Sequence, residues 1–92
     1  MRIRWTEPAA HDLTSICDYI EEHDHPEAAR RVALRICEDV DTLAQFPYQG
    51  RPGRQPGTRE LVFARLPYLA IYRIRDDVIE ITRILHGAQK WP

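Results

Sequence analysis

Four residues in the second half of the chain could carry acid–base chemistry on a phosphate group: Arg65, Tyr68, Arg83 and His86. In metal-free RNA cleavage a base removes the 2′-hydroxyl proton, cations stabilise the phosphorane, and an acid protonates the leaving oxygen. These side chains could take such roles if the fold brought them within hydrogen-bond distance. His86 follows the last expected strand, and a histidine that caps a strand end is the simpler interpretation, which we favour.

Other chemistry has little support in the sequence. It lacks the glycine-rich phosphate loop, the dinucleotide fingerprint, H-E-x-x-H and G-x-S-x-G, so nucleotide-binding, zinc-protease and hydrolase classes are set aside. His23 and His25 are spaced like a metal-binding pair, but they lie in a polar turn with no third ligand nearby. We therefore expect a solvated turn, no metal and no cofactor.

The length of the chain limits its organisation. With 92 residues it can hold one domain, which we place at residues 1 to 92. Cys17 and Cys37 are too few for a disulfide framework, and both fall beside apolar positions of expected helices, so we expect reduced, packed thiols. There is no signal-peptide pattern at the start and no run near the ~18 apolar residues that span a bilayer, so we expect a cytoplasmic protein.

The first half of the sequence predicts a strand and two helices. Residues 2 to 5 alternate arginine and apolar residues, the pattern of a short, half-buried strand. Thr6 can cap a helix over residues 7 to 22, whose apolar positions recur every three or four residues. Asp24 or His25 opens a second helix from residue 27 to about residue 46. The short connection predicts a helical hairpin.

The second half predicts a loop and an antiparallel sheet. Residues 47 to 57 contain three prolines and three glycines, which indicates an ordered loop between the helices and the sheet. Three strands follow, at residues 59 to 65, 69 to 75 and 78 to 85. The expected fold is therefore α+β, with a short N-terminal strand, a helical hairpin and a three-stranded antiparallel sheet in the order β-α-α-β-β-β.

The register of the last two strands predicts two faces. Pairing Arg75 with Val78 across Asp76-Asp77 places Arg73 opposite Glu80. One face should meet the helices: Ala70, Tyr72, Ile74, Ile79, Ile81 and Arg83. The other should carry Leu69, Ile71, Arg73, Glu80, Thr82 and Ile84. That second set is too apolar to leave in water, which indicates that something covers it.

Charge is split along the chain, although its net value is only −1. Residues 1 to 50 carry five arginines against ten acids, a net charge of −5. Residues 51 to 92 carry seven arginines and one lysine against four acids, a net charge of +4. This asymmetry suggests that the C-terminal half faces an anionic partner, although exposed strand faces that simply carry arginine would give the same count.

A set of motifs across nearly the whole chain resembles the ParE/RelE superfamily of bacterial toxins. They are, in order, W-T-x-x-A-x-x-D-L, D-T-L-A-Q-F-P-Y-Q-G-R, G-T-R-E-L, P-Y-L-A-I-Y-R-I and R-I-L-H-G-A-Q. The resemblance implies the toxin half of a type II toxin-antitoxin pair, neutralised by an antitoxin whose C-terminal segment wraps over helices and sheet. We expect that antitoxin to contact Leu69, Ile71, Arg73 and Ile84, and operator DNA to be bound only through it.

The superfamily contains ribosome-dependent mRNA endonucleases similar to RelE and ParE-like members that poison DNA gyrase. In the nucleases a basic residue typically precedes the L-V-Y of the penultimate strand, and here that position is Leu69, which cannot neutralise a phosphate. The nucleases also tend to be strongly basic, whereas this chain is slightly acidic. Both departures favour the ParE-like branch and a protein that is not an enzyme.

Three hypotheses follow. The first is a ParE-like toxin that stalls gyrase through protein contacts, using Arg83, His86 and Trp91. The second is a RelE-like endonuclease that acts on mRNA at the ribosome. The third is a module of the same fold that has lost toxicity and serves only as an antitoxin partner or co-repressor.

Overall fold

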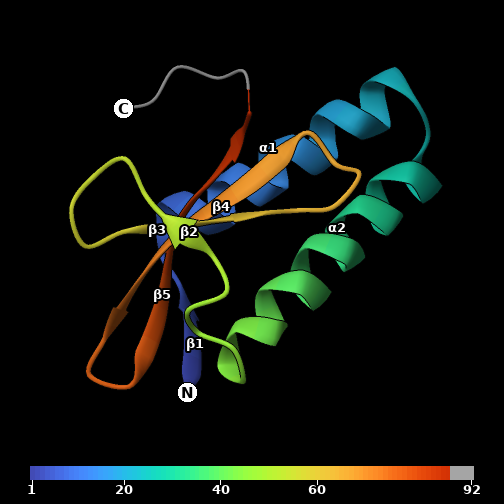
Figure 1. The fold of residues 1–92 in the computed structure, drawn as a ribbon. Helices are drawn as coiled ribbons and strands as arrows, with labels where there is room; N and C mark the ends of the chain where they lie inside the picture. The colour runs from blue at the N-terminus through green and yellow to red at the C-terminus, as the bar shows by residue number, and fades with distance from the viewer. Residues whose placement is uncertain (88–92) are drawn as a thin grey trace.

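The computed structural model describes residues 1–87 and has two helices packed on one side of a five-stranded sheet (Figure 1). The elements are β1 (Arg2–Trp5), α1 (Glu7–His23), α2 (Pro26–Asp41), a 3-10 turn η1 (Thr42–Ala44), β2 (Arg51–Pro52), β3 (Arg59–Val62), β4 (Tyr68–Arg75) and β5 (Val78–His86). The predicted α+β class and helical hairpin are confirmed.

Both helices begin at side-chain caps. The hydroxyl of Thr6 accepts a hydrogen bond from the amide of Ala9 at 3.3 Å, and Nδ1 of His25 accepts one from the amide of Ala28 at 3.3 Å. The second helix ends earlier than predicted. It becomes a 3-10 turn at Thr42, whose hydroxyl donates to the carbonyl of Asp39 at 2.6 Å and so competes for a backbone acceptor near the helix end.

The sheet has five strands in the order β1-β5-β4-β3-β2, so the predicted three-stranded sheet is wrong. β1 lies parallel to β5, and the helical hairpin supplies most of the long crossover that a parallel pair requires. β2 is a two-residue edge strand paired antiparallel with β3. Its Pro52 is tolerated because an edge strand needs no outward amide.

A β-bulge in β5 changes which residues share a face. Tyr72 pairs with Ile81 but Ile71 pairs with Arg83, so Thr82 is an extra residue in β5 that has no partner residue on β4. Beyond the bulge the alternation is reversed. Ile84 therefore lies in the core on the helix side, 2% exposed, and Arg83 lies on the far face beside Ile71; both predicted positions were wrong.

The main core lies between the helices and the near face of the sheet. Its largest fully buried side chains are Ile36, Val40, Leu43, Phe63, Tyr72, Ile79, Ile81 and Ile84. The equally buried Leu85 belongs to a separate cluster. That cluster, on the far face, joins Leu85 to Leu69 and Ile71. Within residues 1–87, no helix is both long enough and apolar enough to cross a membrane.

Candidate functional site

The aromatic pair Tyr68 and His86 lies on the helix side of the sheet. The two residues are cross-strand partners, and their rings meet edge to face with centroids 5.6 Å apart. They line a hollow of about 500 Å³ together with Ser15, Ile16, Tyr19 and Pro67. Burial raises the pKa of the Tyr68 phenol, and the nearby Tyr19 and Cys17 raise it further. A phenol with a raised pKa stays protonated at neutral pH.

Arg83 lies on the opposite face and is held by an acid. Its Nε and Nη2 donate to the carboxylate of Asp12 at 2.7 and 3.0 Å. This bidentate hydrogen bonding raises the pKa of the Arg83 guanidinium above its ordinary value. The positive charge of Arg83, which would be needed to stabilise a phosphorane transition state, is therefore already neutralised by Asp12.

Arg65 occupies a third location. It is exposed, in the connection between β3 and β4, and has a left-handed backbone with φ of 64°. The structure thus brings together only two of the four candidate catalytic residues, Tyr68 and His86. Trp91, the remaining predicted target contact, lies outside the described residues.

The predicted antitoxin contacts divide between the two faces. Leu69, Ile71 and Arg73 lie on the far face as expected, but Leu69 and Ile71 are only 6% and 7% exposed. Ile71 and Arg73 line a hollow of about 370 Å³ with Pro8, Gln55, Thr58, Thr82 and Arg83. Ile84 does not belong to this surface, because it is in the core on the other side.

The predicted Arg73–Glu80 pair is confirmed, but sequence reasoning missed that Glu80 is buried and also binds Arg4, and it missed the buried Glu60 with its partner Arg51. Glu80 is 6% exposed and pairs through one oxygen with Arg73 and through the other with Arg4. Glu60 is 3% exposed, and its Oε1 accepts hydrogen bonds from Nε and Nη2 of Arg51 at 3.1 and 2.9 Å. The alternation of residues 2 to 5 placed Arg4 on a strand face, but nothing local identified β5 as its neighbour.

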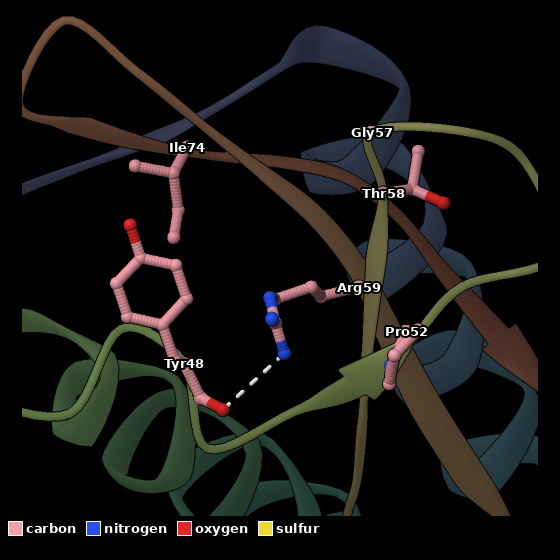
Figure 2. A pocket seen from close by; sticks show the side chains of 6 residues that line it. All are labelled: Tyr48, Pro52, Gly57, Thr58, Arg59 and Ile74. Atoms are coloured by element: carbon pink, nitrogen blue, oxygen red, sulfur yellow. Dashed lines mark hydrogen bonds between the residues drawn. The ribbon is translucent and has the colours of Figure 1, made fainter.

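Figure 2 shows a third hollow, of about 360 Å³, at the β2–β3 edge of the sheet, where Arg59 packs beside Tyr48. The Arg59 guanidinium carbon lies 5.0 Å from the centre of the Tyr48 ring, and Nη1 donates to the carbonyls of Tyr48 and Gly50 at 3.3 and 2.5 Å. Arg59 thus fixes the loop that leads into β2, and its charge is directed inward rather than toward a ligand.

The described part of the chain contains neither a cluster of metal ligands nor a disulfide. Among residues 1–87 no group of three histidine, cysteine or acidic residues could hold a metal ion. Cys17 and Cys37 are free, half-buried thiols. Burial raises the pKa of both, and the adjacent acids Asp18, Glu21 and Asp41 contribute to the same direction.

Comparisons with known proteins assign this fold to a class of small toxins. Residues 3–91 match the family described as the ParE toxin of the type II toxin-antitoxin system parDE. A putative toxin, Y4kP of Sinorhizobium fredii, is 53% identical over 91 residues, covering 99% of this chain and 93% of the relative. Toxin RelE2 of Caulobacter vibrioides is 41% identical over 88 residues, covering 96% and 97%.

Two solved structures share the fold. One, of the chromosomal ParDE toxin-antitoxin system from P. aeruginosa, has a TM-score of 0.89 and 38% identity, covering 94% of this chain and 95% of that one. The other, of the RelBE2 toxin-antitoxin complex from Mycobacterium tuberculosis, has a TM-score of 0.67 and 25% identity, covering 92% and 95%. The chain belongs to the ParE toxin family, within the ParE/RelE superfamily of type II toxin-antitoxin systems.

Proposed function

We propose that this chain is a ParE-like toxin that inhibits DNA gyrase by binding it, without catalysing a reaction. The proposal rests on the separation of Arg83 from His86. These two residues were the leading candidates for a cation and a proton carrier, yet they line hollows on opposite faces of the sheet. General acid–base catalysis needs both groups within hydrogen-bond reach of one phosphate.

Two further observations support the proposal. Arg83 is already bonded to Asp12, so bringing it to a scissile phosphate would break two hydrogen bonds and leave the half-buried carboxylate without its counter-charge. Leu69, at the position where the nucleases carry a basic residue, is 6% exposed and belongs to an apolar cluster. An apolar side chain there cannot stabilise a phosphorane.

A cognate antitoxin completes the proposed system. We expect it to contact the hollow that Ile71 and Arg73 line on the far face. Leu69 and Ile71 are nearly buried in the chain itself, so the 40% exposed side chain of Arg73 offers the more accessible contact. Substituting Arg73 by alanine should therefore weaken antitoxin binding, as measured by calorimetry with the cognate partner.

The second candidate is a RelE-like endonuclease, favoured by the 41% identity to a protein named RelE2 and by the Tyr68–His86 pair. Inducible expression of the chain without its antitoxin separates the two. Growth arrest with DNA damage and intact mRNA supports gyrase inhibition. Arrest with mRNA cuts that His86→Ala abolishes supports the nuclease and overturns the proposal.

A further inference from the structure

The difference in net charge between the helical layer and the sheet layer is larger than the difference between the two halves of the sequence. Residues 7–46, which form the helical layer, carry ten acids against three arginines, a net charge of −7. Residues 1–6 and 47–87, which form the sheet and its loops, carry nine arginines against four acids, a net charge of +5. Such a dipole directs the sheet toward a polyanion and the helices away from it.

Four of these nine arginines form two rows on the far face, next to the β4–β5 turn. In one row Arg2 and Arg75 flank Val78, and in the next Arg4 and Arg73 flank Glu80. Cross-strand partners share a face, and their alternates Ile3, Ile74 and Ile79 pack against the core on the other side. We call these six positions the arginine rows. Asp76 and Asp77, in the turn, border them.

Glu80 orients two of the guanidinium groups. It is 6% exposed, and its two oxygens bind Arg4 and Arg73 from the strands on either side. Arg73 donates to Glu80 through Nε at 2.5 Å, which leaves its terminal amino groups available to other acceptors. Arg2 and Arg75 are exposed, and within residues 1–87 neither forms an ion pair with an acid. Oriented guanidinium groups suit phosphate oxygens.

The composition of the arginine rows also favours a nucleic acid over an acidic protein as the anionic partner. Val78 is their only apolar member. A protein partner is usually held by buried apolar or aromatic anchors, which this end of the face does not provide. Backbone phosphates of a nucleic acid need none, because they are recognised by charge and hydrogen bonds.

We infer that the arginine rows bind the phosphate backbone of duplex DNA without sequence preference, through Arg2, Arg4, Arg73 and Arg75. The choice of duplex DNA over other phosphate polymers rests on the proposed function, because gyrase acts on DNA. The toxin would then contact gyrase and the DNA that gyrase holds at the same time.

Fluorescence anisotropy of the full chain with a labelled DNA duplex, at salt concentrations from 50 to 200 mM, tests this inference. Four phosphate contacts give a logarithmic salt slope of about −3.6, equivalent to roughly a hundredfold loss of affinity across that range. The double variant Arg2→Gln/Arg75→Gln should reduce the slope by about half. Neither side chain forms an ion pair, so the fold is retained, which circular dichroism checks.

Arg30→Gln/Arg31→Gln is the matched control, because it removes the same charge from two exposed positions on α2. It should leave the slope unchanged. Absence of binding at 50 mM salt, an equal effect of the control, or tighter binding to single-stranded RNA or to polyglutamate would overturn the inference. Gyrase inhibition without duplex binding defeats this inference alone, and duplex binding without gyrase inhibition defeats the proposed function alone.

Discussion

The carboxylate of Asp12 on α1 binds both the side chain of Arg83 and the backbone beside it on β5. It accepts hydrogen bonds from the Arg83 guanidinium at 2.7 and 3.0 Å and from the amide of Ile84 at 3.0 Å. β1 ends at Trp5, so the edge of β5 beyond Ile81 lacks a strand partner there. Asp12 supplies the acceptor that this edge would otherwise lack.

Asp12→Ala should therefore lower the free energy of unfolding by about 2 to 3 kcal/mol, since it leaves the Ile84 amide and the part-buried guanidinium of Arg83 unpaired. Urea unfolding followed by circular dichroism measures the loss. Asp18→Ala, at an exposed position of the same helix, is the control and should cost less than about 0.5 kcal/mol. Equal losses for the two variants would show that Asp12 has no special structural role.

Tyr72 and Gly50 form a second specific contact. The Tyr72 hydroxyl accepts a hydrogen bond from the Gly50 amide at 3.0 Å and donates one to the carbonyl of Pro47 at 2.8 Å. A Cβ on residue 50 would lie 2.6 Å from that hydroxyl and 2.8 Å from the carbonyl oxygen of Glu60. The loop before β2 is thus fitted to a glycine.

Tyr72→Phe should destabilise the protein by about 1 to 3 kcal/mol, because the buried Gly50 amide loses its acceptor. Gly50→Ala should also destabilise, because a backbone carbonyl cannot move aside as a flexible side chain can. Thermal unfolding measures both. Tyr48→Phe, in a side chain that is 65% exposed, should have a much smaller effect, and a comparable loss there would contradict the assignment.

The β4–β5 turn carries local strain that substitution can relieve. Asp76 and Asp77 have φ values of 47° and 63°, the left-handed region that a two-residue hairpin loop of type I′ requires at both positions. Asp76→Asn/Asp77→Gly should stabilise the protein by about 1 kcal/mol, which for a chain of this size raises the melting temperature by about 4 to 8 °C. An unchanged or lower melting temperature would show that the aspartates make compensating contacts.

The cysteines should react slowly with alkylating reagents. Burial raises the pKa of Cys17 and Cys37, so less thiolate is present near neutral pH than in an exposed cysteine. Iodoacetamide should label the native chain several-fold more slowly than a cysteine introduced at the exposed Ser15, and the rate should rise with pH. Equal labelling rates would contradict the burial of the thiols.

The same thiols make a contribution to stability that depends on pH. A pKa raised in the folded state means that the unfolded chain releases its proton first. Their contribution is complete below the ordinary thiol pKa and is lost as the pH rises through the raised folded pKa. Urea titrations on either side of that range measure the loss, which Cys17→Ala should reduce.

Local pattern predicted much of this fold. The alternation at residues 2 to 5, the Thr6 cap and the Asp76-Asp77 turn each depend on neighbours in the chain, and each was found where expected. The neighbour of β1 could not be predicted, because its partner residues begin at Val78, beyond the entire helical hairpin. β2 was missed because two residues in a proline-rich loop give no alternation.

The candidate site was less predictable because one residue alters the register. Period-two alternation put Arg83 with the helices and Ile84 on the far face, and the bulge at Thr82 exchanged them. Its cause is tertiary: where β1 ends, β5 is bonded instead to Thr6 and Asp12. Arg4 and Arg51, which bind the buried Glu80 and Glu60, were missed for a related reason, since they come from strands whose pairing was not predicted.

The most direct test of the account is a supercoiling assay of purified DNA gyrase with the full chain, run beside a ribosome-dependent mRNA cleavage assay on the same preparation. Concentration-dependent loss of supercoiling, reversed by the cognate antitoxin, with intact mRNA is the predicted result. Unimpaired supercoiling together with mRNA cleavage that requires His86 would contradict it and would assign the chain to the nucleases.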